Sequence, residues 1–188
     1  MIGFLLHLDT LLFNLFNQTL TNSVLDWLMP RLTNLDNWKL PILLIWIALM
    51  VWGGRKGRAA ALLIILTITL SDQVSSFVIK PLVHRIRPCH VVETVRLLVG
   101  CSGSFSFPSS HATNSMAAAG LFGGFYRKYR WYFYVLAGLI AYSRVYVGVH
   151  YPLDVIAGAI LGFLIGWMVV LGYNRWLKER IEIEPGKN

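Results

Sequence analysis

An arginine, a histidine and an aspartate stand close together between two long apolar runs, at Arg144, His150 and Asp154. An ionisable side chain at the edge of an apolar segment costs free energy unless it is paired with another group or takes part in function. Such side chains therefore mark a candidate functional site. If Pro152 is the first residue of a helix, Asp154 lies in its first turn and can reach one imidazole nitrogen of His150. An aspartate that holds one ring nitrogen leaves the other free as a nucleophile or a base.

A basic cluster precedes this stretch, in the segment Lys80–Pro88. It carries Lys80 and Arg87, and its prolines are expected to end a helix and stiffen the exit. Taken alone, a basic run after an apolar segment is typical of an anchor to lipid head groups.

A third cluster, Pro108–His111, is typical of a helix start. The hydroxyls and free backbone N–H groups of Ser109 and Ser110 would then point outward, and helix N-termini of this kind bind anions, phosphate above all. The alternative is plain capping by one of the serines, with His111 as an interfacial histidine.

Together the three clusters supply the groups that phosphoryl transfer requires. Cations and N–H dipoles stabilise the three equatorial oxygens, a nucleophile attacks in line, and an acid protonates the leaving oxygen. Arginine suits the phosphate because its planar fork binds two oxygens at once. The sequence therefore predicts phosphate chemistry at a site that the three clusters share.

The order and spacing of these residues resemble a known signature. Lysine, six residues and Arg-Pro (Lys80–Pro88) are followed by Pro-Ser-Ser-His (Pro108–His111), and then by Ser-Arg, five residues, His, three residues and Asp (Ser143–Asp154). This pattern resembles the tripartite signature of the type 2 phosphatidic acid phosphatase and vanadium haloperoxidase superfamily. One position departs from it, since the usual signature has Gly where this chain has Ser110.

The resemblance implies a role for each matched residue. His150 would be the nucleophile that forms a phosphohistidine, Asp154 would orient it, and His111 would protonate the leaving oxygen and then activate water. The implied phosphate ligands are Lys80, Arg87, Ser109, Ser110 and Arg144. The resemblance also implies chemistry without a metal or other cofactor, and the sequence has no clustered carboxylates of the kind that holds magnesium.

The composition predicts which elements position these groups. The chain has 188 residues, of which 56% are hydrophobic and only 14% charged, with a mean hydropathy of +0.58. Its apolar residues cluster into runs near the roughly 20 residues that a membrane-crossing helix needs. We therefore predict an all-α, polytopic membrane helix bundle that forms a single domain, residues 1–188. The five predicted spans are Leu40–Gly54, Ala59–Ile79, His111–Tyr126, Trp131–Val149 and Leu153–Tyr173.

Residues 1–38 are expected to form an interfacial region ahead of a transmembrane core, residues 40–173. The first apolar stretch, Ile2–Phe16, fits a helix lying in the membrane surface, because polar residues repeat along one helical face. Those polar residues are His7, Thr10, Asn14 and Asn17. A second short amphipathic helix is expected to end at Pro30. The alternative is a sixth span across Ile2–Leu20.

The net charge of +8 is distributed in a way that predicts topology rather than nucleic-acid binding. Ten of the 17 basic residues lie in the links after the first and third spans and in the tail 174–188, which share one side of a five-span bundle. Because basic residues concentrate on the cytoplasmic side, the C-terminus is expected in the cytoplasm. The site then faces the periplasm or exterior, from a bacterial cytoplasmic (inner) membrane.

Both cysteines, Cys89 and Cys101, fall in the predicted outward loop, residues 80–110. An oxidising compartment would allow them to close this loop as a disulfide. Two unrelated free thiols are the alternative.

The resemblance thus implies a metal-independent lipid phosphatase, and the charge distribution predicts that its site lies at the outer face of the membrane. Its partners would be the bilayer and a phospho- or diphospholipid, and no oligomeric state is predicted. The candidate substrates are those that the resemblance to bacterial members of the family implies. The outward site favours undecaprenyl diphosphate, while phosphatidylglycerophosphate, phosphatidic acid and lipid A are the alternatives. Two other classes of function stay open. One is a non-enzymatic protein that binds or transports lipid phosphates, and the other is a vanadate-dependent haloperoxidase.

Overall fold

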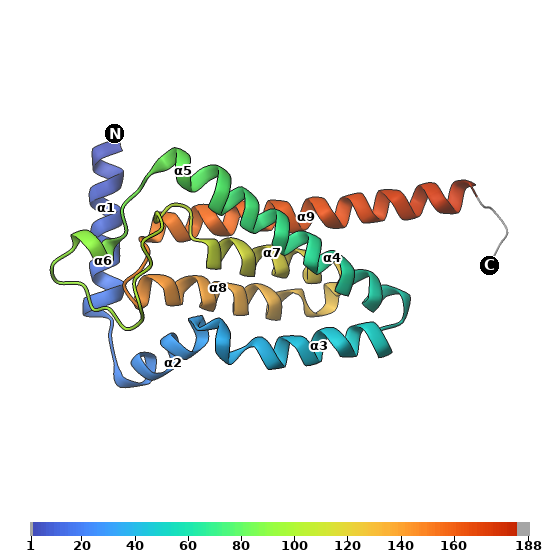
Figure 1. Ribbon diagram of the computed structural model, residues 1–188, viewed down its shortest axis with the longest axis horizontal. Helices are drawn as coiled ribbons and strands as arrows, with labels where there is room; N and C mark the ends of the chain where they lie inside the picture. The colour runs from blue at the N-terminus through green and yellow to red at the C-terminus, as the bar shows by residue number, and fades with distance from the viewer. Residues whose placement is uncertain (1, 184–188) are drawn as a thin grey trace.

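A computed structural model describes residues 2–183 of the chain, and its side chains from Gly3 to Leu177. Every regular element within that range is helical, which confirms that the fold is all-α. Five long helices run along the molecule and coincide with the five predicted apolar segments (Figure 1). They are α3 (Lys39–Trp52), α4 (Gly54–Asp72), α7 (Ser110–Phe125), α8 (Arg130–Tyr146) and α9 (Pro152–Ile183).

Two helical stretches of the described chain are long and apolar enough to cross a membrane by length and composition. They are Gly54–Val91, which joins several successive helices, and Pro152–Leu177; Lys39–Trp52 is apolar but shorter. The number of spans, five or six, therefore stays a prediction.

Helix α7 is the central helix of the bundle and packs along α9, α8 and α4. Glycines bring α7 and α9 unusually close, since a Cβ built at Gly162 would lie 2.0 Å from the carbonyl oxygen of Thr113. Small residues at such a seam let two helix backbones approach each other. The first turns of the two helices consequently meet, and the Ser109 N–H donates to the backbone carbonyl of Asp154 at 3.0 Å.

The N-terminal helix α1 (Ile2–Asn14) is steeply inclined to the five long helices (Figure 1). It crosses the end of the bundle that carries the short helix α6 (Pro88–Val91). Its buried face consists of Asp9, Phe13 and, in the π-helical turn that follows, Asn17. The sequence places Asn17 on a polar, water-facing side, and this is wrong because the Asn17 amide bonds to backbone groups of the bundle.

Helix α2 (Ser23–Thr33) is pinned to the end of α8 through one carboxylate. Asp26 accepts hydrogen bonds from the Tyr146 hydroxyl at 2.6 Å and from Arg96 at 2.7 Å. These two contacts, Tyr146 foremost, hold the pKa of Asp26 below its ordinary value of 3.8. The helix continues one turn past Pro30, contrary to prediction, and Asn34 N–H still bonds to the Pro30 carbonyl at 3.2 Å.

Two further helices end later than the sequence predicts. The second apolar segment passes Pro81 because a π-helical stretch (η3, Gln73–Ile79) widens the helix ahead of this proline. The helix then ends after α5 (Lys80–Val83), where His84 is left-handed with φ 53°. Helix α9 continues beyond Tyr173 to Ile183, since no glycine or proline interrupts it there; residues 184–188 of the predicted tail lie outside the described residues.

Candidate active site

The predicted nucleophile lies in the short loop between α8 and α9. Helix α9 begins at Pro152, as predicted. The loop turns at Gly148, where φ is +88° and a Cβ would lie 2.7 Å from the backbone oxygen of Arg96, so the position requires glycine. The His150 N–H donates to the backbone carbonyl of Arg144 at 3.2 Å, which ties the loop to the last turn of α8.

The contacts of the buried His150 ring define its tautomer. Nε2 lies 3.0 Å from Nη1 of Arg87, and Nδ1 lies 3.5 Å from Oδ2 of Asp154. A guanidinium can only donate, so Nε2 accepts and the ring proton is on Nδ1, facing the carboxylate. The predicted pairing of His150 with Asp154 is therefore present. Burial lowers the pKa of His150 to about 3, so the ring is neutral and Nε2 keeps its lone pair.

Asp154 is in turn held by three donors. Its Oδ2 accepts the backbone N–H of Tyr151 at 2.9 Å and the hydroxyl of Ser106. Its Oδ1 accepts Nη1 of Arg85 at 2.7 Å. Since the side chain is 0% exposed, these bonds replace the water that the carboxylate loses and fix its orientation toward His150.

Arg85 joins Asp154 to a second buried carboxylate, Asp9 of α1. Nη2 of Arg85 lies 2.5 Å from Oδ2 of Asp9, whose Oδ1 accepts the backbone N–H of Leu153 at 2.8 Å. The guanidinium also stacks over the Tyr151 ring, 4.1 Å from its centroid. Sequence reasoning missed Asp9 and Arg85, although an aspartate inside an apolar segment is itself a signal of a functional site. No sequence signal separated Arg85 from its basic neighbours.

Two of the predicted phosphate ligands carry unpartnered donors. The hydroxyl of Ser109 and Nε of Arg144 are the two buried side-chain polar atoms of the described chain that lack a hydrogen-bond partner. Ser109 stands at the N-cap of α7 without making a side-chain capping bond, so the capping alternative is wrong for this serine. A buried donor left unpaired costs about 1–3 kcal/mol, which suits a site that receives its acceptor from a ligand.

The remaining predicted basic ligands, Lys80 and Arg87, are held by the loop that precedes α7. The Lys80 ammonium donates to the carbonyl of Phe105 at 3.0 Å. Besides its contact with His150, Arg87 donates to the carbonyl and the hydroxyl of Ser104, at 2.7 and 2.9 Å. Both side chains are buried, Lys80 at 6% and Arg87 at 5% exposure, so their positive charges are held in place near His150.

Ser110 and His111 occupy the first turn of α7. Ser110 fits without strain, because His84 is the one non-glycine residue of the described chain with positive φ. The Ser110 hydroxyl lies 3.1 Å from that of Ser76. His111 lines a cavity of about 570 Å³ together with Arg144, whose Nη1 donates to the hydroxyl of Thr33 at 2.5 Å. His111 therefore faces the same cavity as Arg144, a predicted phosphate ligand.

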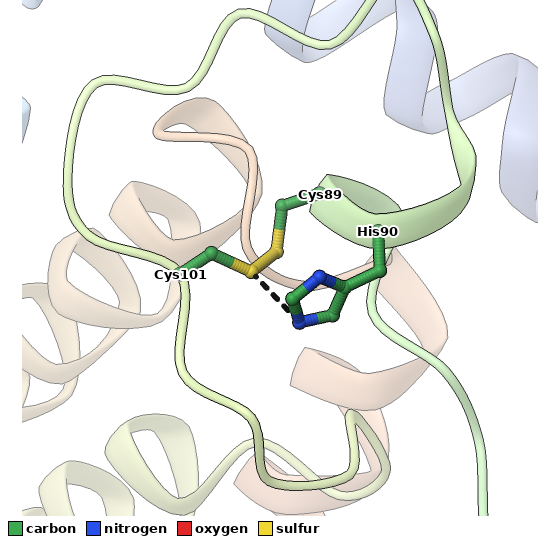
Figure 2. A group of neighbouring side chains, drawn as sticks. All are labelled: Cys89, His90 and Cys101. Atoms are coloured by element: carbon green, nitrogen blue, oxygen red, sulfur yellow. Dashed lines mark hydrogen bonds between the residues drawn. A yellow bond between two sulfur atoms is a disulfide. The ribbon is translucent and has the colours of Figure 1, made fainter.

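The two cysteines close the loop beside Arg87 as a disulfide, with Cα atoms 6.4 Å apart (Figure 2). Nε2 of His90 lies 3.3 Å from Sγ of Cys101, so among the described residues these three side chains form one group with metal-ligand chemistry. Bonded to each other, the sulfurs offer no thiolate to a metal ion. In this oxidised state the disulfide restrains the loop next to Arg87.

Comparison with known proteins identifies the family of this chain. The sequence pattern of the PAP2 superfamily matches residues 61–178. A lipid A 4'-phosphatase of Bacteroides thetaiotaomicron is 36% identical over 178 residues, which cover 89% of this chain and 78% of the relative. The undecaprenyl-diphosphatase BcrC of Bacillus subtilis is 32% identical over 151 residues, covering 78% of this chain and 74% of the relative.

The fold agrees as well. The crystal structure of a transmembrane PAP2 type phosphatidylglycerolphosphate phosphatase from Bacillus subtilis superposes with a TM-score of 0.70 at 26% identity, covering 91% of this chain and 86% of that one. The chain therefore belongs to the PAP2 superfamily, and the predicted membrane-bound phosphatase is confirmed at the level of that family.

Proposed function

We propose that this protein hydrolyses the terminal phosphate of a membrane lipid through a phosphohistidine formed on His150. The observation that carries the proposal is the pair of buried, unpartnered donors on Ser109 and Arg144, next to a neutral histidine whose lone pair is oriented by Asp154. These groups match an incoming phosphoryl group, whose oxygens accept the free donors while phosphorus meets Nε2.

In the first step, Nε2 of His150 attacks phosphorus and the bond to the leaving oxygen breaks. His111 donates its proton to that oxygen, and Asp154 stabilises the positive charge that develops on the His150 ring. Arg87 leaves Nε2 and turns its N–H groups to the phosphoryl oxygens. Lys80, with the other predicted ligands, balances the negative charge there.

In the second step, water attacks the phosphorus of the phosphohistidine. His111, now neutral, takes a proton from that water, the N–P bond breaks, and inorganic phosphate leaves. The positive charge that a phosphoryl transfer needs comes in this scheme from the side chains of Lys80, Arg87 and Arg144. We therefore expect activity to persist in EDTA, and a strict magnesium requirement would contradict this scheme.

Lipid A is the first candidate substrate. Among the relatives described above, the one with the highest sequence identity to this chain, 36%, is named a lipid A 4'-phosphatase. Asn34 and Asp36 line the cavity that His111 and Arg144 share, where they can bond to the hydroxyls of a sugar head group. Undecaprenyl diphosphate is the second candidate, supported by the similarity to BcrC and by the predicted outward orientation of the site.

The proposed orientation places the site at the outer face of a bacterial inner membrane, with the C-terminus in the cytoplasm. The site lies where α7 begins, whereas the basic links lie where α4 begins and α7 ends. At 1.5 Å per residue, the 16 residues of α7 separate the two ends by about 24 Å, close to the hydrocarbon thickness of a bilayer.

The test is phosphate release by the purified protein in EDTA from lipid A, undecaprenyl diphosphate, phosphatidylglycerophosphate and phosphatidic acid. With a radiolabelled phosphoryl group, quenched enzyme should carry label that resists alkali and is lost in acid, as a phosphohistidine does. His150→Ala should abolish both signals, while His7→Ala, at an exposed position of α1, should leave them unchanged. Lipid binding without phosphate release by the unaltered protein would instead identify a binding or transport protein.

A further inference from the structure

A second cavity lies at the opposite end of the bundle from His150. It has a volume of about 800 Å³ and is enclosed by the start of α4, the end of α7, the 3-10 turn η4 (Arg127–Tyr129) and α9. Four cationic side chains line it: Arg55, Lys56, Arg127 and Lys128.

Among the side chains that the structure describes, none is an acidic partner of these four cations. In the described part of the chain, no carboxylate forms an ion pair with any of them; Lys56 lies over the Tyr126 ring at 5.0 Å and Lys128 over the Tyr129 ring at 5.6 Å. Like charges around one cavity repel each other, and the repulsion is relieved when an anion enters. The positive charge around the cavity therefore favours an anionic ligand.

Most of the other residues that line the cavity are apolar or aromatic. Phe125 and Val170 are each 7% exposed, and the Phe125 ring packs against that of Tyr173 with centroids 5.0 Å apart. Helix α9 approaches α7 closely here, since a Cβ at Gly124 would lie 2.7 Å from a methyl group of Val170. A cationic rim beside such a wall fits an amphiphile better than a free ion, because the head and the start of the tails both find partners.

We propose that this cavity binds the phosphate head group of an anionic phospholipid, as a site separate from the one that contains His150. The same phosphate chemistry could be supplied by free inorganic phosphate, so the test compares the two sources. The proposal does not depend on the proposed function, because no residue of the site around His150 takes part.

Two other arginines provide a matched control. Arg58 and Arg130 lie in the same two links but outside the cavity; Arg58 donates to the carbonyl of Met50, and Arg130 packs over the Trp131 ring. The double variant Arg55→Gln/Arg127→Gln and the double variant Arg58→Gln/Arg130→Gln thus remove equal charge from the same end of the molecule. They separate binding in the cavity from general attraction of basic links to an anionic surface.

The experiment measures retention of phosphatidylglycerol by native mass spectrometry and the shift in unfolding temperature on its addition, in zwitterionic detergent. Phosphatidylglycerol is a phosphodiester and offers no terminal phosphate to the site around His150. The cavity double variant should bind about 30-fold more weakly, since each basic residue near a lipid head group contributes about fivefold, and the control double variant should bind as the unaltered protein does.

Three outcomes would overturn the proposal. One is equal weakening in both double variants, which would mean that general charge attracts the lipid. Another is equal retention of phosphatidylcholine, whose head group is zwitterionic. The third is an equal rise in unfolding temperature with millimolar inorganic phosphate and no lipid, which would identify a site for the free anion.

Discussion

Removing the guanidinium of Arg85 is expected to destabilise the protein strongly, because two buried carboxylates would be left without their shared cation. Asp9 and Asp154 both have side chains that are 0% exposed, and they accept one N–H group each from Arg85 at 2.5 and 2.7 Å. Deleting one partner of a buried ion pair costs about 3–5 kcal/mol, so Arg85→Gln should lower the free energy of unfolding by about 4 kcal/mol.

Whether Asp9→Asn lowers or raises the free energy of unfolding should depend on whether Arg85 is present. In the unaltered protein this change replaces a charge-assisted hydrogen bond by a neutral one and should cost about 2 kcal/mol. In the Arg85→Gln background it removes one of two unpaired buried carboxylates, and should restore about 1 kcal/mol. The two residues should therefore be coupled by about 3 kcal/mol.

The assay is unfolding by sodium dodecyl sulfate in mixed micelles, followed by tryptophan fluorescence, for the unaltered protein, the two single variants and the double variant. The pair Asp36 and Lys39 is the control, since its side chains are 71% and 76% exposed at a distance of 2.6 Å. Asp36→Asn and Lys39→Gln should be coupled by less than about 1 kcal/mol, as exposed ion pairs are. A coupling between Asp9 and Arg85 as small as that would refute the argument that they form a buried pair at the site.

Three more predictions concern the site. Ser109→Ala should lower kcat/KM about 10-fold or more, because it removes one hydrogen bond to a charged group. The unfolding temperature should stay unchanged, because the hydroxyl has no partner in the free protein. A large loss of stability would contradict this. The pKa of His150 is lowered to about 3 from an ordinary 6.5, so between these values the unfolded chain binds the extra proton and stability falls as pH drops below about 6.5. Thermal unfolding of the protein and of His150→Gln, compared from pH 7 to pH 4, should show the unaltered protein losing stability relative to the variant, and parallel curves would speak against a buried neutral ring. Reducing the disulfide between Cys89 and Cys101, which are 12 residues apart, should cost about 3 kcal/mol by the loop-entropy relation, measured as a drop in unfolding temperature with dithiothreitol that Cys89→Ser/Cys101→Ser no longer shows.

The pairing at the centre of the site could be predicted from sequence because it is local. His150 and Asp154 are four residues apart, and Pro152 begins the helix between them, so their contact follows from the geometry of one helix start. The five long helices could be predicted for a similar reason, because long apolar runs specify them without reference to the rest of the fold.

The supporting ion network could not be predicted in the same way. Asp9 and Arg85 are 76 residues apart and meet only because α1 crosses the end of the bundle. Periodicity misplaced the buried face of α1, since polar residues occur on both of its sides, and the side that faces the bundle uses Asp9 and Asn17 to bond buried groups. A polar residue at a buried position looks like a surface residue until its partner is known.

The contact of Arg87 with Nε2 of His150 has a consequence for how selectively the histidine reacts. A neutral imidazole nitrogen is an attractive ligand for zinc and copper ions, and it reacts readily with alkylating agents. In the free protein that lone pair accepts a hydrogen bond at 3.0 Å from a cation that repels metal ions. A phosphoryl group, by contrast, carries the negative oxygens that draw the guanidinium away. As the proposed nucleophile, His150 is thus shielded from metal ions and unrelated electrophiles, and the proposed anionic substrate would expose its lone pair by displacing Arg87.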